Sequence, residues 1–166
     1  MGDINNKEQN VVYLSLLEKS LEKKAAILEQ LIELTEEQKT LIDDDKLTNE
    51  QFDDIFDKKG ELIKQINELD NGFEQLYQRV RDELNANPGG FKMQIEQLKK
   101  LITDVTDKGV RLQVLERSNK ERIDSYLKNK RESIKSFKVN SKTASRYYSN
   151  INNATIDNSY FFDKKK

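Results

Sequence analysis

The stretch from Thr48 to Val80 carries a seam of apolar residues that constrains the fold more than any other feature of the chain. Lys59 holds the one polar position in this series, whose apolar members recur at alternating steps of three and four residues: Phe52, Ile55, Leu62, Ile66, Leu69, Phe73, Leu76 and Val80. A mean spacing of about 3.5 residues is typical of a coiled-coil helix. Because so long a seam is not stable in water, we expect other helices to cover it.

Two breaks divide the chain into three predicted helices, over residues 7–42, 49–86 and 91–137. Asp43–Asp45 is the first break, since three carboxylates at a helix C-terminus oppose the helix dipole. Thr48 followed by Gln51 predicts a capping box that starts the second helix. Asn87–Gly90 contains the only proline and predicts a tight reversal. The predicted fold class is all-α, an elongated antiparallel three-helix bundle or coiled coil.

Polar residues interrupt the seams of the two outer helices. Lys24, Thr35 and Gln38 occupy apolar positions of the first helix, and beyond Leu115 the pattern of the third helix loosens. The seam of the first helix is therefore predicted to be weaker than that of the second.

Residues 138–166 differ in composition from the rest of the chain, because Asn, Ser and Thr dominate and apolar residues stand singly. This composition predicts a segment that is disordered in isolation, a flexible polar tail with aromatic anchors. The anchors are Tyr147, Tyr148, Ile151, Ile156, Tyr160, Phe161 and Phe162. Tyr147, Ile151 and Ala154 would share one face of a helix. Two alternatives remain: the anchors pack back on the bundle, or they contact a partner.

Composition argues against an enzyme. The chain has no histidine and no cysteine, so the most common general bases, nucleophiles and soft metal ligands are missing. Asp43–Asp54 has the length of a calcium loop, but Leu47 replaces a ligand and Thr48 replaces the glycine that the loop requires. We expect no catalytic residue, no cofactor and no metal site.

Charge and hydropathy limit the partners and the location. Charged residues make up 36% of the chain, but the net charge of -1 favours neither nucleic acid nor membrane. Residues 36–57 are acidic and residues 117–146 are basic, which predicts two solvated faces of opposite sign. The N-terminus lacks the pattern of a signal peptide, and no apolar run approaches the ~18–20 residues of a membrane span. We therefore expect a cytoplasmic protein.

Three stretches resemble the flagellar export chaperones of the FlgN type, which serve the hook–filament junction proteins. These are the Leu- and Glu-rich helix with its acidic break (residues 28–66), Asn119 with Ile123, Tyr126 and Leu127 after it, and the tail with Tyr147 or Tyr148 and its Ser-Tyr-Phe-Phe-Asp-Lys-Lys-Lys ending. The resemblance implies a chaperone without ATPase activity that binds the terminal segments of hook-associated proteins and delivers them to the export gate. It adds Asn119, Ile123 and Tyr126 to the tail anchors as candidate partner-binding residues.

The alternative function is a structural or adaptor coiled coil that self-associates, for instance as a homodimer. A structural rod has no need of the aromatic anchors in the tail, whereas a protein that binds clients or docks on the export gate does. The tail is therefore the feature that distinguishes the two hypotheses.

Overall fold

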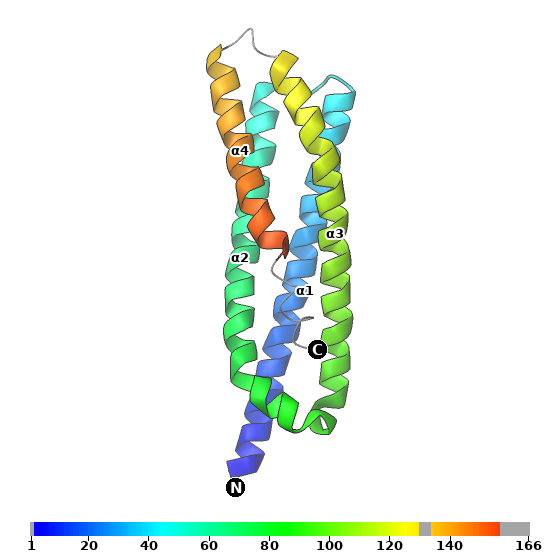
Figure 1. The fold of residues 1–166 in the computed structure, drawn as a ribbon, viewed down its shortest axis with the longest axis vertical. Helices are drawn as coiled ribbons and strands as arrows, with labels where there is room; N and C mark the ends of the chain where they lie inside the picture. The colour runs from blue at the N-terminus through cyan, green and yellow to red at the C-terminus, as the bar shows by residue number, and fades with distance from the viewer. Residues whose placement is uncertain (1, 130–133, 157–166) are drawn as a thin grey trace.

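The computed structural model describes residues 2–129 and 134–156, which are almost entirely helical (Figure 1). Its elements are α1 (Gly2–Asp43), α2 (Asn49–Ala86), the 3-10 helix η1 (Pro88–Phe91), α3 (Lys92–Asn129) and α4 (Ile134–Ile156). The all-helical prediction is confirmed for these residues. The three-helix arrangement is not, because a fourth helix is present.

The helices form an elongated bundle in which α1 and α3 run in one direction and α2 and α4 in the other (Figure 1). Ion pairs between Lys108 Nζ and Glu29 Oε2 (3.2 Å) and between Arg122 Nε and Asp43 Oδ1 (3.0 Å) connect the parallel helices α1 and α3. α1 packs against both α2 and α3, whereas α4 packs mainly against α2 and less extensively against α3. In the part of the bundle that α4 covers, α1 and α4 are therefore diagonal to each other.

The connection between α1 and α2 is built from local hydrogen bonds. Asp45 has a positive φ of 55°, and Lys46 N donates to Leu41 O over 2.8 Å, which closes α1 in the manner of a Schellman motif. The predicted capping box is confirmed: Gln51 N donates to Thr48 Oγ1 (3.1 Å), and Thr48 N donates to Gln51 Oε1 (3.0 Å). These bonds satisfy the backbone groups that a helix end leaves unpaired.

The core runs along the bundle axis, and its register in α2 differs from the predicted seam. Leu62, Leu69 and Leu76 are only partly buried, while Phe56 and Ile63 are fully buried. The reason is that α2 packs against two helices, α1 and α4, so its buried face is wider than a single coiled-coil seam. Lys59, the polar position of the seam, is itself completely buried.

The prediction of a disordered tail from residue 138 is wrong as far as Ile156. α3 ends at Asn129 instead of continuing to residue 137, and α4 then continues through much of the expected tail. Asn140, Ala144, Tyr147 and Ile151 are buried at steps of four and three, which gives α4 one packed face. Tertiary packing has overridden the low helix propensity of its Ser, Thr and Asn residues. Residues 157–166, the rest of that tail, lie outside the described part of the chain.

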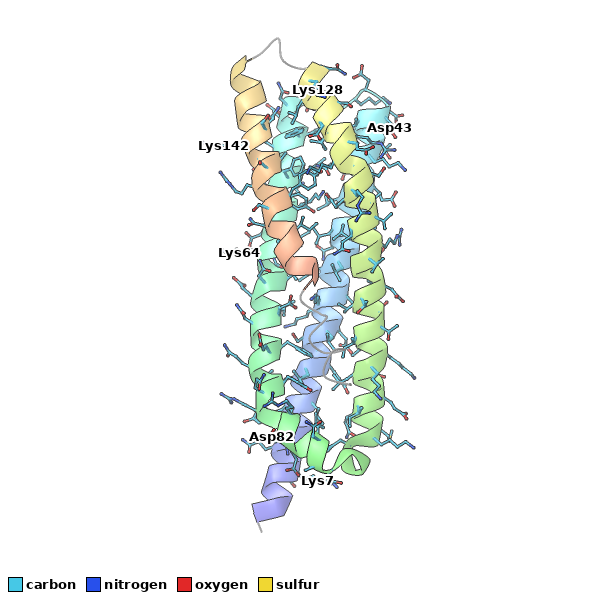
Figure 2. The ribbon with its side chains drawn as sticks, in the orientation of Figure 1. Lys7, Asp43, Lys64, Asp82, Lys128 and Lys142 are labelled. Atoms are coloured by element: carbon cyan, nitrogen blue, oxygen red, sulfur yellow. The ribbon has the colours of Figure 1, made fainter. Side chains whose placement is uncertain are left out.

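Charged side chains cover the outside of the bundle (Figure 2). Lys64 on α2 and Lys142 on α4 are exposed and point away from their neighbours (Figure 2). Across residues 2–129 and 134–156, every helix lacks the combination of length and apolar character that crossing a membrane requires.

Candidate functional site

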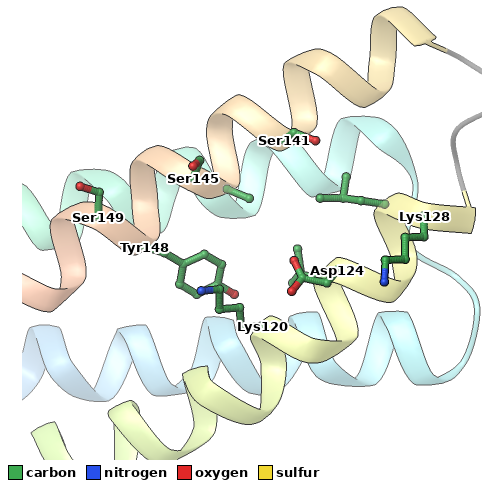
Figure 3. A pocket seen from close by; sticks show the side chains of 10 residues that line it. Lys120, Asp124, Lys128, Ser141, Ser145, Tyr148 and Ser149 are labelled. Carbon is green, nitrogen blue, oxygen red and sulfur yellow. The ribbon is translucent and has the colours of Figure 1, made fainter.

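A groove of ≈ 510 Å³ opens between α3 and α4 (Figure 3). Its apolar lining comes from Ile123 and Leu127 on α3 and from Ala144 on α4, all three buried. Its polar lining consists of Lys120, Asp124, Lys128, Ser141, Ser145, Ser149 and the ring of Tyr148. An apolar floor with polar walls suits a partner segment that has one apolar face.

Tyr148 projects from α4 toward α3 inside this groove (Figure 3). Lys120 Nζ lies 5.7 Å from the centroid of its ring, within the range of a cation–π contact. Burial raises the pKa of the Tyr148 phenol well above its ordinary value, and the carboxylates of Glu116 and Asp124 raise it further. The phenol is therefore a neutral group at physiological pH.

Beneath the groove lies a polar node, which we define as Thr35, Gln38, Lys59, Glu116 and Asn119. All five side chains are buried, although four of them are amide or charged groups. Lys59 Nζ donates to Glu116 Oε1 in an ion pair and to Gln38 Oε1 over 2.8 Å. Asn119 Nδ2 donates to Thr35 O (3.2 Å) and to Gln38 Oε1 (3.3 Å). The node thereby joins α1, α2 and α3, because its hydrogen bonds link side chains on different helices.

Thr35 completes the node from α1. Its Oγ1 lies 2.6 Å from Glu116 Oε1 and 2.7 Å from Leu31 O. A hydroxyl has one hydrogen to donate, so the two acceptors compete for it.

Tyr147 connects α4 to the polar node. Its hydroxyl donates to Glu116 Oε1 over 3.2 Å, and Lys59 Nζ lies 4.3 Å from the centroid of its ring. Burial raises the pKa of Tyr147 well above its ordinary value, with Glu116 adding to the effect. Burial lowers the pKa of Lys59, and the neighbouring Glu116 carboxylate opposes that change.

An aromatic cluster continues from the node toward the α1–α2 connection. The Phe56 and Tyr147 rings lie 5.4 Å apart between centroids, Phe52 and Phe56 4.9 Å, and Phe52 and Tyr126 5.5 Å. The Tyr126 hydroxyl donates to Leu47 O over 3.4 Å. Stacked and tilted rings at these distances stabilise the packing beyond the area that they bury.

The structure places the candidate partner-binding residues mostly inside the bundle. Asn119, Ile123, Tyr126, Tyr147 and Ile151 are buried, and Tyr148 is half-buried. Ile123 and Tyr148 meet in the groove, Asn119 and Tyr147 meet around the node, and Tyr126 lies in the aromatic cluster. The side chain of Ile156 and the residues Tyr160, Phe161 and Phe162 lie outside the described part. The prediction that these ten residues bind a partner stays a prediction.

Sequence reasoning missed the residues that give the site its chemistry. Lys59 and Gln38 stood out only as polar positions in apolar seams, and Glu116 was not singled out at all. The signal was present, because a charged residue in a core position is buried only when it is paired. Among the described residues, no cluster of His, Cys, Asp or Glu is suited to holding a metal ion.

Comparison with known proteins gives one match. A family model described as FlgN protein matches residues 14–155, which include the polar node and the α3–α4 groove. No curated protein and no solved structure matches the chain.

Proposed function

This chain belongs to the FlgN family, whose members are flagellar export chaperones, and from that premise we propose that it binds the terminal segments of hook-associated proteins in the cytoplasm and delivers them to the export gate. Shielding those segments prevents their premature assembly. The observation that carries the proposal is the α3–α4 groove with its apolar floor and polar walls.

The groove suits the ends of such clients, which are amphipathic helices. A helix of this kind buries its apolar stripe in a groove and leaves its polar side at the rim. Ile123, Leu127 and Ala144 offer the apolar surface, while Lys120 and Asp124 supply charges of both signs at the wall. The groove extends along α4, where its lining residues Ser141, Ser145 and Ser149 lie at successive turns.

Deeper engagement requires α4 to move, because Tyr147 and Ile151 face the bundle. Over residues 140–151, the part of α4 whose burial is described, the buried apolar side chains are Ala144, Tyr147 and Ile151, and Tyr147 rests on the polar node. α4 packs less extensively against the other helices than α1 and α3 do. A helix with less tertiary packing is drawn from the less stable part of a fold. We propose that a client enters at the groove and then replaces part of the α4 packing.

The test is binding of purified hook-associated junction proteins to variants of the groove wall. Ser145→Arg places a long charged side chain in the groove from an exposed position of α4, and should weaken binding by about tenfold or more because it obstructs the apolar floor. Asn150→Arg is the matched control, since it adds the same side chain to an exposed α4 position outside the groove. Calorimetry with the full-length client and with a client lacking its terminal helices measures the difference.

Equal binding by the two arginine variants would remove the groove as the client site. Binding of the truncated client as tightly as the intact one would contradict recognition of terminal segments. Circular dichroism of both variants checks that α4 is still helical.

A further inference from the structure

A second groove follows the outer side of α1 and α2, on a different pair of helices from the proposed client site. It consists of two hollows of ≈ 460 Å³ and ≈ 450 Å³, each lined by α1 and α2. Leu34 and Leu62 form the apolar floor of one hollow, and Ile27 and Leu69 form that of the other. Leu34, Leu62 and Leu69 are only partly buried, so their apolar surface is incompletely covered.

The spacing of these floor residues fits one more helix. Ile27 and Leu34 on α1 are seven residues apart, as are Leu62 and Leu69 on α2. A seven-residue repeat on both walls presents the pattern into which a third coiled-coil strand inserts its own apolar residues. The α1 lining extends from Lys23 to Glu37, which corresponds to about 21 Å of helix, or four turns.

The charge at the rim identifies the kind of helix. Glu33, Glu37, Glu61 and Glu68 line the groove from exposed positions, against the two lysines Lys23 and Lys58. In the part of the chain that the structure describes, none of the four carboxylates lies within 4.0 Å of a cationic group. Four carboxylates beside an apolar floor therefore remain available to a cationic partner.

The opposite side of α1 shows what such carboxylates do when a basic helix is present. Glu29 and Glu36 on α1 face α3, where they pair with Lys108 (3.2 Å) and Arg111 (3.7 Å). The same helix thus pairs its carboxylates toward its neighbour and leaves those of the outer groove without such partners. A second copy of this chain that docked by the same face would bring like charges together, which disfavours self-association there.

We propose that the α1–α2 groove binds an amphipathic helix with a heptad apolar stripe flanked by Lys or Arg. The stripe covers Ile27, Leu34, Leu62 and Leu69, and the basic flanks face the four glutamates. This surface is separate from the α3–α4 groove, so the proposal neither rests on the client site nor fails with it.

The test uses two synthetic peptides, each about three heptads long, with the same leucine stripe. One carries Lys at the flanking positions and the other carries Glu. Two-dimensional NMR of the full chain at low ionic strength should show that the Lys peptide shifts the amide signals of residues 23–37 and 58–69, and that added salt weakens this binding. The Glu peptide should bind about tenfold more weakly or worse.

Variants of the protein make the test specific. Glu33→Lys combined with Glu61→Lys should weaken binding of the Lys peptide by about tenfold and strengthen binding of the Glu peptide, since both changes reverse the charge at the rim. Glu96→Lys combined with Asp107→Lys, two exposed positions of α3 outside the groove, is the matched control and should change neither affinity appreciably.

Three results with the unmodified protein would overturn the proposal. These are equal binding of the two peptides, amide shifts that map to α3 and α4 instead, and self-association of the protein through residues 23–37 and 58–69. Equal loss of binding in the control variant would also overturn it, because net charge and not the groove would then decide affinity.

Discussion

The buried ion pair between Lys59 and Glu116 is the feature whose removal the structure predicts most sharply. Both side chains are nearly inaccessible, with exposed fractions of 0% for Lys59 and 5% for Glu116. Lys59→Met removes the ammonium but retains a flexible apolar chain that still packs on Phe56 and Tyr147. The Glu116 carboxylate then keeps the hydroxyl donor of Tyr147, competes with Leu31 O for that of Thr35, and loses its cation.

The expected loss is large, because one charge is left buried without its partner. Breaking a buried pair in this way costs about 3–5 kcal/mol. A domain of this size has a free energy of unfolding of about 5–15 kcal/mol, so Lys59→Met should remove a large share of it. The corresponding fall in the melting temperature is about 6–20 °C, at about 2–4 °C for each kcal/mol.

Urea unfolding followed by far-ultraviolet circular dichroism measures this loss, and the double variant Lys59→Met with Glu116→Gln separates charge from packing. The double variant should recover to within about 1–2 kcal/mol of the wild type, since no buried charge remains. Glu36→Gln is the control, because the pair of Glu36 with Arg111 is exposed on both sides and should contribute less than about 1 kcal/mol. A loss for Lys59→Met no larger than that of the control would refute the reasoning, and so would a double variant no more stable than the single one.

Three further predictions concern local features. Gly72→Ala should stabilise the protein by about 0.5–1 kcal/mol in urea unfolding, because the site is an exposed position of α2 where an added Cβ has no neighbour within 4 Å. Thr48→Ala should destabilise it by about 1 kcal/mol in the same assay, because the capping box is lost, whereas Thr48→Ser should have little effect. Tyr148→Phe should reduce the loss of stability as pH rises above ~10, since the pKa of Tyr148 is raised in the folded protein and the ordinary phenol ionises first in the unfolded chain. Unfolding curves at about pH 9 and about pH 11 measure the loss of stability for the wild type and for Tyr148→Phe. The two losses are equal if Tyr148 is exposed in solution.

The fold was largely predictable where local chemistry decides it. The capping box at Thr48 and the break after Asp43 follow from residues that act on their immediate neighbours. The apolar period likewise predicts long helices. Such patterns can be interpreted without information on the rest of the chain.

The part that could not be predicted depends on contacts between distant residues. α4 is rich in Ser, Thr and Asn, and its buried face has a place to pack only because α2 and α3 present a surface to it. The buried face of α2 likewise depends on the helices that pack against it and differs from the predicted seam, so Leu69 lines an outer groove instead of the core. Leu69→Asp should accordingly cost less than the several kcal/mol that a core position implies.

The polar residues that interrupt the seams show most clearly how sequence and structure are related. Considered helix by helix, Gln38, Lys59 and Asn119 each weaken an apolar seam. In the bundle they lie at one level and bond to one another, and Glu116 supplies the charge that Lys59 requires. Among the described residues, Gln38 Nε2, Asn119 Oδ1 and Glu116 Oε2 are buried without a hydrogen-bond partner. Such a network can form only when the helices are aligned in this register, because a shift of one turn would leave each group buried and unpaired. Tyr147 joins α4 to the same node, so the polar residues that interrupt the seams of α1, α2 and α3 also fix the position of α4. Replacing Tyr147 should therefore loosen α4 itself, and a binding defect in such a variant would report on the placement of that helix and not on one lost contact with a client.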